Sequence, residues 1–150
     1  MQYTVEILVH LPRDEFVKKL DDPENMKHWQ NGLLQYEHLS GVPGEEGAQM
    51  SLSYNMGNRN VDMVETIIKR NFPHELHASY DTKGVQNIQK NYFEEVDGKT
   101  LWKSDNIFKF SSFMMKLIGI LMPGAFKKQT MKYLNDFKAF AENGTSVMDS

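Results

Sequence analysis

Six strand-like segments follow one another between residues 33 and 110, and this run constrains the fold more than any other feature of the chain. They span residues 33–40, 48–56, 60–70, 75–82, 86–96 and 100–110, and short turns rich in Gly, Pro, Asn and Asp separate them. Neighbouring parallel strands need crossovers of a dozen or more residues, which these turns are too short to provide. We therefore expect an antiparallel meander.

Helical patterns flank this run. An alternating strand at residues 3–9 precedes two short helices, each with a proline (Pro12 and Pro23) suited to its first turn. After residue 111 the period becomes helical, and a long amphipathic helix follows Pro123. A seven-stranded antiparallel sheet must bury one face, and the last helix is the one long element available to cover it. The expected fold class is α+β, with the sheet curved around the C-terminal helix.

The composition narrows the class of protein. The 150 residues favour one domain, and 17 basic against 20 acidic residues, mixed along the chain, argue against nucleic-acid binding. Cysteine is absent, which excludes disulfides and thiolate metal sites and fits a reducing compartment. The first residues show no secretory signal, and no apolar stretch reaches the ~20 residues of a membrane span. We expect a cytoplasmic protein with no membrane span, no metal site and no cofactor.

Several motifs together resemble the START/Bet v 1-like (SRPBCC, polyketide cyclase-like) superfamily. They are residues 12–17, residues 20–29, the segment from Glu65 to Phe72-Pro73, the Asp97-Gly98 turn and the closing helix. The resemblance covers residues 3 to 142 and implies a helix-grip fold with a cavity for apolar ligands. Members include lipid carriers, hormone receptors, cyclases, lyases and chaperone co-factors, so the resemblance implies the cavity and no catalytic residue. Residues 1–144 are expected to form one such domain and residues 145–150 a disordered tail.

Turn chemistry predicts which side chains face inward. Asp97-Gly98 is a two-residue type I′ signal, and it places Lys90 opposite Asp105, an opposite-charge pair typical of a solvent face. The other face then carries Asn87, Gln89, Asn91, Phe93, Trp102, Ser104, Asn106 and Phe108. Buried polar groups without partners cost about 1–3 kcal/mol each. The inward amides and hydroxyl must therefore bond one another in a closed network or line a cavity that holds water or ligand.

The Gly57-Asn58 turn, treated in the same way, pairs Met50 with Glu65 and Leu52 with Met63. Tyr54, Met63 and Glu65 then point inside. Glu65 would be the one acid of the pocket, and desolvation would raise its pKa, as a general acid or base requires. The alternative is that Glu65 sits at a sheet end, or that a longer turn directs it outward.

The closing helix carries an apolar stripe at three- and four-residue steps that includes Phe126, Thr130 and Phe137. Core packing is the competing interpretation for each residue of this stripe and for Trp29. The predicted ligand-binding residues are Tyr54, Met63, Asn91, Phe93, Trp102, Ser104, Asn106, Phe108, Phe126, Thr130 and Phe137. Glu65 is the candidate for a catalytic residue.

The segment from Phe113 to Met122 is apolar almost all round, so as a surface helix it would expose a large patch. Three interpretations are open. The segment could be a flap over the pocket, a homodimer contact through Phe113, Leu117 and Leu121, or a site that docks on a membrane surface.

Three functions fit these features. The first is binding of a hydrophobic or aromatic small molecule in a cavity between the sheet and the C-terminal helix, as a carrier or sensor. The second is a polyketide cyclase/lyase-like enzyme that uses the same pocket, with Glu65, Tyr54 and Asn91 or Asn106 in proton transfer. The third is a chaperone-activator-like protein-interaction module. Because the sequence shows no clear acid–base pair, binding is favoured over catalysis.

Overall fold

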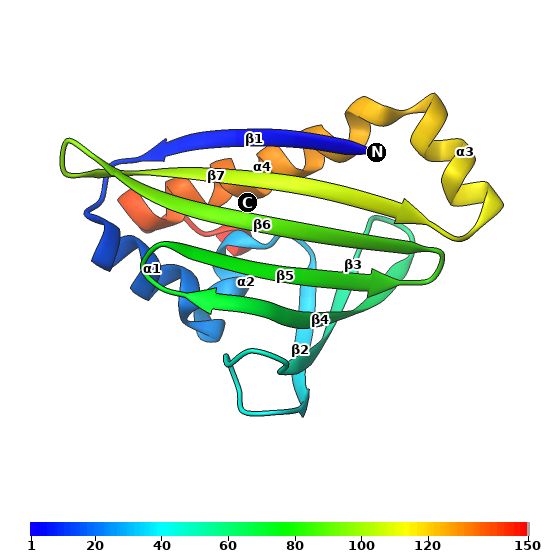
Figure 1. The fold of residues 1–150 in the computed structure, drawn as a ribbon, viewed down its shortest axis with the longest axis horizontal. Helices are drawn as coiled ribbons and strands as arrows, with labels where there is room; N and C mark the ends of the chain where they lie inside the picture. Colours follow the sequence, from blue (N-terminus) through cyan, green and yellow to red (C-terminus); the bar gives the residue numbers. More distant parts are fainter. Residues whose placement is uncertain (150) are drawn as a thin grey trace.

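The structure is a computed structural model that describes residues 1–149, and its elements follow the order expected from the sequence (Figure 1). They are β1 (Gln2–Val9), α1 (Arg13–Asp21), the 3₁₀ helix η1 (Pro23–Asn25), α2 (Met26–Trp29), β2 (Leu33–Ser40), β3 (Gln49–Asn55), β4 (Asn60–Asn71), β5 (Glu75–Thr82), β6 (Val85–Val96), β7 (Lys99–Phe110), α3 (Phe113–Leu121), α4 (Pro123–Asn143) and the 3₁₀ helix η2 (Val147–Asp149).

The seven strands form one antiparallel sheet in the order β1-β7-β6-β5-β4-β3-β2. The register expected from the Asp97-Gly98 turn is confirmed, since Lys90 lies opposite Asp105 and Asn91 opposite Ser104. Asp97 and Gly98 both have positive φ (51° and 76°), as a type I′ turn requires. The register expected from the Gly57-Asn58 turn is confirmed as well, because Met50 pairs with Glu65.

The helices begin and end where local chemistry directs them. The Asp22 side chain accepts a hydrogen bond from the Glu24 N–H ahead of α2, and the Ser112 side chain accepts one at the start of α3. Pro123 occupies the first turn of α4, where its missing N–H costs no hydrogen bond. Gly144 ends α4 in the left-handed region at φ 70°.

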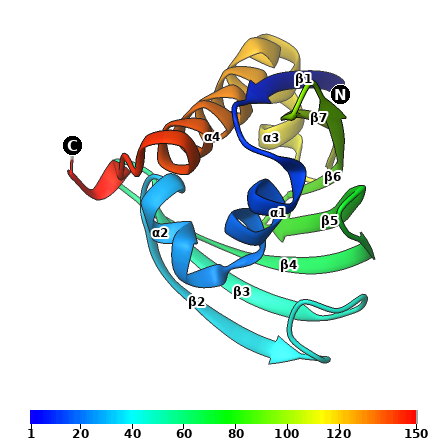
Figure 2. The same ribbon diagram turned by 90° about the vertical axis from the view of Figure 1, so that its left-hand side faces the viewer.

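The sheet curves around the helices, as the resemblance implies, with α4, α1 and α2 on its concave side (Figure 2). Phe137 of α4 is fully buried at the centre of an aromatic cluster. Its ring lies 5.1 Å from Phe16, 5.2 Å from Trp29 and 5.4 Å from Trp102. This cluster, which also includes Val5, Val9, Phe93, Leu134 and Ala141, fixes α4 and α1 against β1, β6 and β7.

A second apolar cluster, separate from the first, lies nearer the other edge of the sheet. Met26, Leu52 and Tyr54 form its buried centre, and the partly buried Met50, Met63 and Tyr80 pack against it together with Leu33 and Tyr36. The fold therefore has two apolar clusters on one concave face.

The end of the described chain differs from the expected disordered tail. Val147–Asp149 form a 3₁₀ helix beside α2, and His28 Nδ1 lies 2.9 Å from Ser146 Oγ. The His28 ring also stacks on Phe140 of α4, with ring centroids 5.5 Å apart. Ser150 lies outside the described residues.

Candidate functional site

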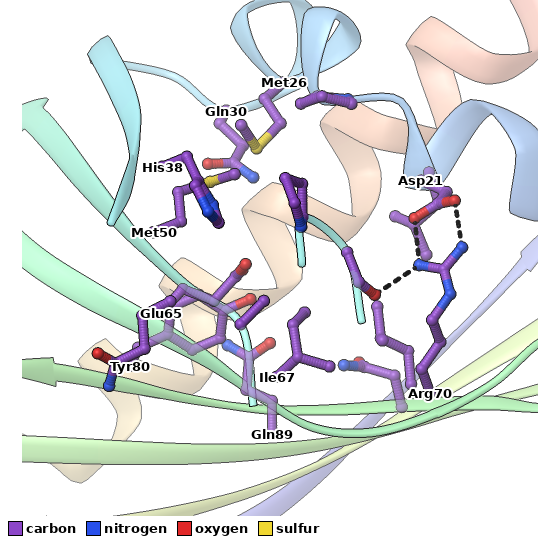
Figure 3. A pocket seen from close by; sticks show the side chains of 18 of the residues that line it. Asp21, Met26, Gln30, His38, Met50, Glu65, Ile67, Arg70, Tyr80 and Gln89 are labelled. Atoms are coloured by element: carbon purple, nitrogen blue, oxygen red, sulfur yellow. Dashed lines mark hydrogen bonds and ion pairs between the residues drawn. The ribbon is translucent and has the colours of Figure 1, made fainter. Parts of the chain in front are cut away.

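A cavity of about 280 Å³ lies where the two apolar clusters meet (Figure 3). Trp29 and Trp102 come from the aromatic cluster, and Met26, Met50 and Tyr80 from the second. The other apolar lining residues are Leu20, Pro23, Pro43, Gly44, Ala48, Ile67 and Leu76. The polar ones are Asp21, Gln30, His38, Gln49, Glu65, Arg70, Gln89 and Asn91.

The position of this cavity corrects the expected one. None of the described residues that line it belongs to α4; the cavity lies between the sheet and the segment formed by α1, η1 and α2. The reason is the depth at which α4 packs. Phe137 and Leu134 rest directly in the aromatic cluster, with 0% and 3% of their surfaces exposed, and fill the space beneath that helix.

Arg70 closes one side of the cavity. Its guanidinium donates two hydrogen bonds to the Asp21 carboxylate at the end of α1, at 2.8 and 2.7 Å, and a third to the Gly44 carbonyl at 3.0 Å (Figure 3). The same guanidinium lies over the Phe72 ring, 4.5 Å from its centroid. Arg70 thereby joins β4, α1 and the loop between β2 and β3, because one planar cation satisfies all three contacts.

Glu65 lines the cavity from β4, on the inward face that its pairing with Met50 predicts. Burial raises the pKa of its carboxyl, and a hydrogen bond with Tyr80 opposes that shift without reversing it. Burial and the neighbouring Glu65 raise the pKa of Tyr80, which keeps its proton and donates to the carboxyl. Among the described lining residues Arg70 is the one Lys or Arg, and it forms its ion pair with Asp21 rather than with Glu65. Glu65 is therefore a carboxyl with a raised proton affinity in a largely apolar cavity.

Tyr54 lies behind the lining rather than in it. Its hydroxyl donates to the Gln30 side chain, and burial is the first cause of its raised pKa, followed by the charges of Tyr133 and Glu65. This hydrogen bond ties β3 to the residue that follows α2, and it orients Gln30, which does line the cavity. Tyr54 acts on the site by positioning Gln30.

Some of the inward polar side chains form a closed hydrogen-bonded network, and others line the cavity; the sequence had left both alternatives open. Gln89 donates to Asn87 Oδ1 at 2.9 Å, Asn87 to Asn106 Oδ1 at 3.4 Å, and Asn106 to Ser104 Oγ at 3.0 Å. These four residues form a hydrogen-bonded chain across β6 and β7. Of this chain, the cavity lining includes Gln89. Ser104 and Asn106 are closed within the network, with 1% and 0% exposure.

The two indoles differ in their hydrogen bonding. Trp102 Nε1 donates to Asn91 Oδ1 at 2.9 Å, so two predicted ligand-binding residues that line the cavity satisfy each other. Trp29 also lines the cavity with 8% of its surface exposed, and its Nε1 has no hydrogen-bond partner among the described residues. A buried donor without an acceptor costs about 1–3 kcal/mol.

The other predicted ligand-binding residues lie outside the cavity lining. Phe93 and Phe137 lie inside the aromatic cluster, and Met63 packs on the second one. Phe108 and Phe126 contact each other, 4.9 Å between centroids, near the start of α4. Thr130 on α4 is buried with its Oγ1 2.6 Å from the Tyr3 hydroxyl. Of the sequence-predicted set, the cavity brings together Asn91, Trp102 and the catalytic candidate Glu65.

Sequence reasoning missed Tyr80, Arg70 and Gln30. A signal for Tyr80 existed, because Lys83-Gly84 is also a two-residue turn, and it pairs Thr82 with Val85 and Tyr80 with the inward Asn87. No comparable turn signal predicted that Arg70 faces the cavity. A register shift follows Ile67, and it changes which side chains of β4 point inward.

Two other expectations from the sequence concern α3 as a flap and the absence of a metal site. None of the α3 residues is among those that line the cavity, and the flap interpretation of residues 113–122 stays a prediction. Within residues 1–149, no three His, Asp or Glu side chains cluster closely enough to hold a metal ion.

Solved structures of other proteins share the fold at low sequence identity. Ara h 8.0201 superposes with a TM-score of 0.76 at 12% identity, over 94% of this chain and 97% of its own. A protein from Thermus thermophilus has a TM-score of 0.77 at 10% identity, over 97% and 100% of the two chains. A norcoclaurine synthase point mutant from Thalictrum flavumn, in complex with a transition-state analogue, has a TM-score of 0.68 at 11% identity over 94% and 93%. No family model and no curated protein sequence matches the chain. The chain therefore has the Bet v 1-like helix-grip fold.

Proposed function

We propose that the protein binds a small aromatic molecule in the cavity between the sheet and the α1–α2 segment, as a carrier or sensor. The observation that carries the proposal is a cavity walled by two indoles and by apolar side chains, with the buried carboxyl of Glu65 on the wall formed by the sheet. The cavity volume of about 280 Å³ is close to the lower limit of small-molecule sites, which is about 300 Å³. One or two rings fit this volume better than a long acyl chain.

The polar groups indicate the chemistry of the ligand. The Trp29 N–H beside the cavity lacks an acceptor, and Glu65, whose carboxyl has a raised pKa, offers a second donor on the wall formed by the sheet when it carries its proton. A ligand with an acceptor oxygen, such as a carbonyl, satisfies such donors, whereas a pure hydrocarbon leaves them unpaired. We infer an aromatic ligand that carries at least one acceptor oxygen.

Acetophenone and ethylbenzene test this inference as a matched pair that differs in one carbonyl oxygen. The chain has two tryptophans, both of which line the cavity, so their indole N–H signals in ¹⁵N-labelled protein report binding directly. We expect both probes to shift the signals. Acetophenone should bind about two- to tenfold more tightly, the effect of one net hydrogen bond of about 0.5–1.5 kcal/mol.

The control is Trp29→Phe, which keeps an aromatic wall and removes the N–H. It should bind ethylbenzene nearly as the wild type does and lose the preference for acetophenone. If neither probe shifts either indole signal at millimolar concentration, the cavity does not bind this class of molecule and the proposal fails.

A second candidate function is proton transfer by Glu65, in a cyclase- or lyase-like reaction. It is favoured by the geometry of a carboxyl of raised pKa beside Tyr80 inside a ligand-sized cavity. In deuterated water, a general base at Glu65 would accelerate exchange of the methyl protons of bound acetophenone, and Glu65→Gln would abolish that acceleration. Binding without any accelerated exchange would leave the carrier or sensor function. The cytoplasmic location expected from the composition stays a prediction.

A further inference from the structure

The outward face of α3 is an unusual surface for a protein of this size. Phe113, Met114, Leu117, Ile120 and Leu121 recur at helical steps on one side and are exposed, Phe113 to 79% and Ile120 and Leu121 to 70% each. We call these five residues the α3 face. Figure 1 shows α3 at one end of the molecule, beyond the strands of the sheet. Contiguous apolar surface of this kind marks an interaction site.

The opposite side of α3 is packed and capped, so the helix is a built part of the fold. A Cβ on Gly119 would come within 2.8 Å of the Phe110 ring, which shows how closely the helix approaches β7. The Ser112 side chain accepts a hydrogen bond from the Met115 N–H and caps the first turn. The structure therefore holds the α3 face outward rather than letting it turn into the core.

The sequence on either side of α3 carries charges of one sign. From residue 106 to residue 135 the sequence contains five lysines and no acidic residue, in a chain whose net charge is −3. Lys132 pairs with Asp136 at 2.6 Å, and Lys109 shares a surface hollow with Asp81. Lys116, Lys127 and Lys128, which are exposed and form no ion pair among the described residues, we call the basic rim.

We propose that the α3 face and the basic rim dock the protein on an anionic lipid surface. A short helix with an apolar face and flanking lysines lies in the membrane interface, where its apolar side chains enter the acyl boundary and its lysines meet lipid phosphates. No helix of the described residues is long and apolar enough to cross a membrane, so α3 would lie on the surface. This inference is independent of the ligand in the cavity.

A second copy of the chain is the less favourable occupant. In a two-fold dimer the same patch meets itself, so the basic rim of one copy would face that of the other. The sequence from residue 106 to residue 135 has no acid to separate those charges. An anionic lipid surface supplies the missing negative charge together with an apolar layer.

Vesicle flotation tests the proposal with the full chain. The probes are vesicles of phosphatidylcholine alone and vesicles of equal parts phosphatidylcholine and phosphatidylglycerol. We expect the wild-type protein to float with the anionic vesicles and to dissociate as salt is added, because salt screens the lysine contribution. Binding to the neutral vesicles should be at least tenfold weaker.

Two variants separate the apolar and the charged contributions. The triple variant Phe113→Ser, Ile120→Ser, Leu121→Ser should lose at least about tenfold in vesicle affinity for each side chain that inserts. The triple variant Lys116→Gln, Lys127→Gln, Lys128→Gln should lose about fivefold per lysine, roughly a hundredfold together. All six side chains are exposed, so both variants should keep the thermal unfolding midpoint of the wild type.

Matched controls remove similar groups elsewhere. The pair Leu34→Ser, Ile68→Ser removes exposed apolar residues of β2 and β4, and the triple Lys18→Gln, Lys99→Gln, Lys103→Gln removes exposed lysines outside α3 and α4. Both should bind anionic vesicles as the wild type does. Three results overturn the proposal: no flotation of the wild-type protein, equal losses in the controls, or a wild-type dimer in sedimentation that the α3 serine variant abolishes while vesicle binding is absent.

Discussion

At the scale of single residues, Glu65 links the cavity to the stability of the fold. Its pKa is raised in the folded protein, chiefly by burial, whereas in the unfolded chain the carboxyl returns to its ordinary value of 4.5. The folded state therefore binds this proton more tightly. The stability that the proton contributes is complete below pH 4.5 and is lost as the pH rises from there through the folded-state pKa.

Glu65→Gln should remove this pH dependence. The amide keeps the shape of the side chain and can still bond Tyr80, but it cannot ionise. We expect the free energy of unfolding of the variant, relative to the wild type, to increase from pH 4.5 upward and to level off above the folded-state pKa. Urea unfolding across a pH series measures it. A difference that stays constant with pH would contradict the assignment of Glu65 as a buried carboxyl. The exposed Glu94→Gln on β6 controls for the loss of one negative charge.

At the scale of elements, the strand pairing could be predicted from the sequence, whereas the packing depth of α4 could not. The pairing of β6 with β7 could be predicted residue by residue, because a two-residue turn leaves one register and the Lys90–Asp105 pair identifies the outer face. The inward position of Glu65 followed in the same way. What the turns could not provide is the depth of α4. That depth depends on how Phe137 packs among three rings from α1, α2 and β7, which are distant in the sequence.

The contacts of Arg70 hold three elements together at one side of the cavity. It fastens α1 and the β2–β3 loop to β4, yet Arg70 and Asp21 are partly exposed, at 25% and 38% of their side-chain surfaces. Partly exposed ion pairs contribute little to global stability, typically about 0–1 kcal/mol. The contact should therefore control local opening more than unfolding.

Arg70→Met should show this difference. The variant loses the two bonds to Asp21 and the bond to the Gly44 carbonyl, so amide exchange in residues 41–47 and at the end of α1 should accelerate at least several-fold. The midpoint of thermal unfolding should change by no more than a few degrees, and ethylbenzene should dissociate faster from the cavity. Lys132→Met, which breaks an exposed pair on α4, is the control. Unchanged exchange in residues 41–47 would show that Arg70 does not hold the loop.

At the scale of the whole molecule, the two apolar clusters are the central feature of the fold. The aromatic cluster is closely packed around Phe137, whereas the second cluster stops short of it and leaves a cavity of about 280 Å³. Space of this kind lowers stability, since the atoms that line it lack packing partners. Proteins keep such costs where a function requires them. The molecule would thus trade packing for a ligand site beside the second cluster, while the aromatic cluster on the same concave face secures the fold.

Filling the cavity should reverse that trade. Ile67 lines the cavity from β4 with 9% of its surface exposed, and Ile67→Phe adds a ring to free space. We expect the free energy of unfolding to rise by about 0.5–2 kcal/mol, as cavity-filling substitutions commonly do, while the affinity for ethylbenzene falls at least tenfold. The matched substitution Val9→Phe places the same ring in the aromatic cluster, where Val9 is fully buried, and should cost about 1–3 kcal/mol through overpacking. Urea unfolding and probe titration of both variants measure the two effects. If Ile67→Phe destabilises the protein as much as Val9→Phe does, the second cluster is as tightly packed as the first, and the space for a ligand does not exist in solution.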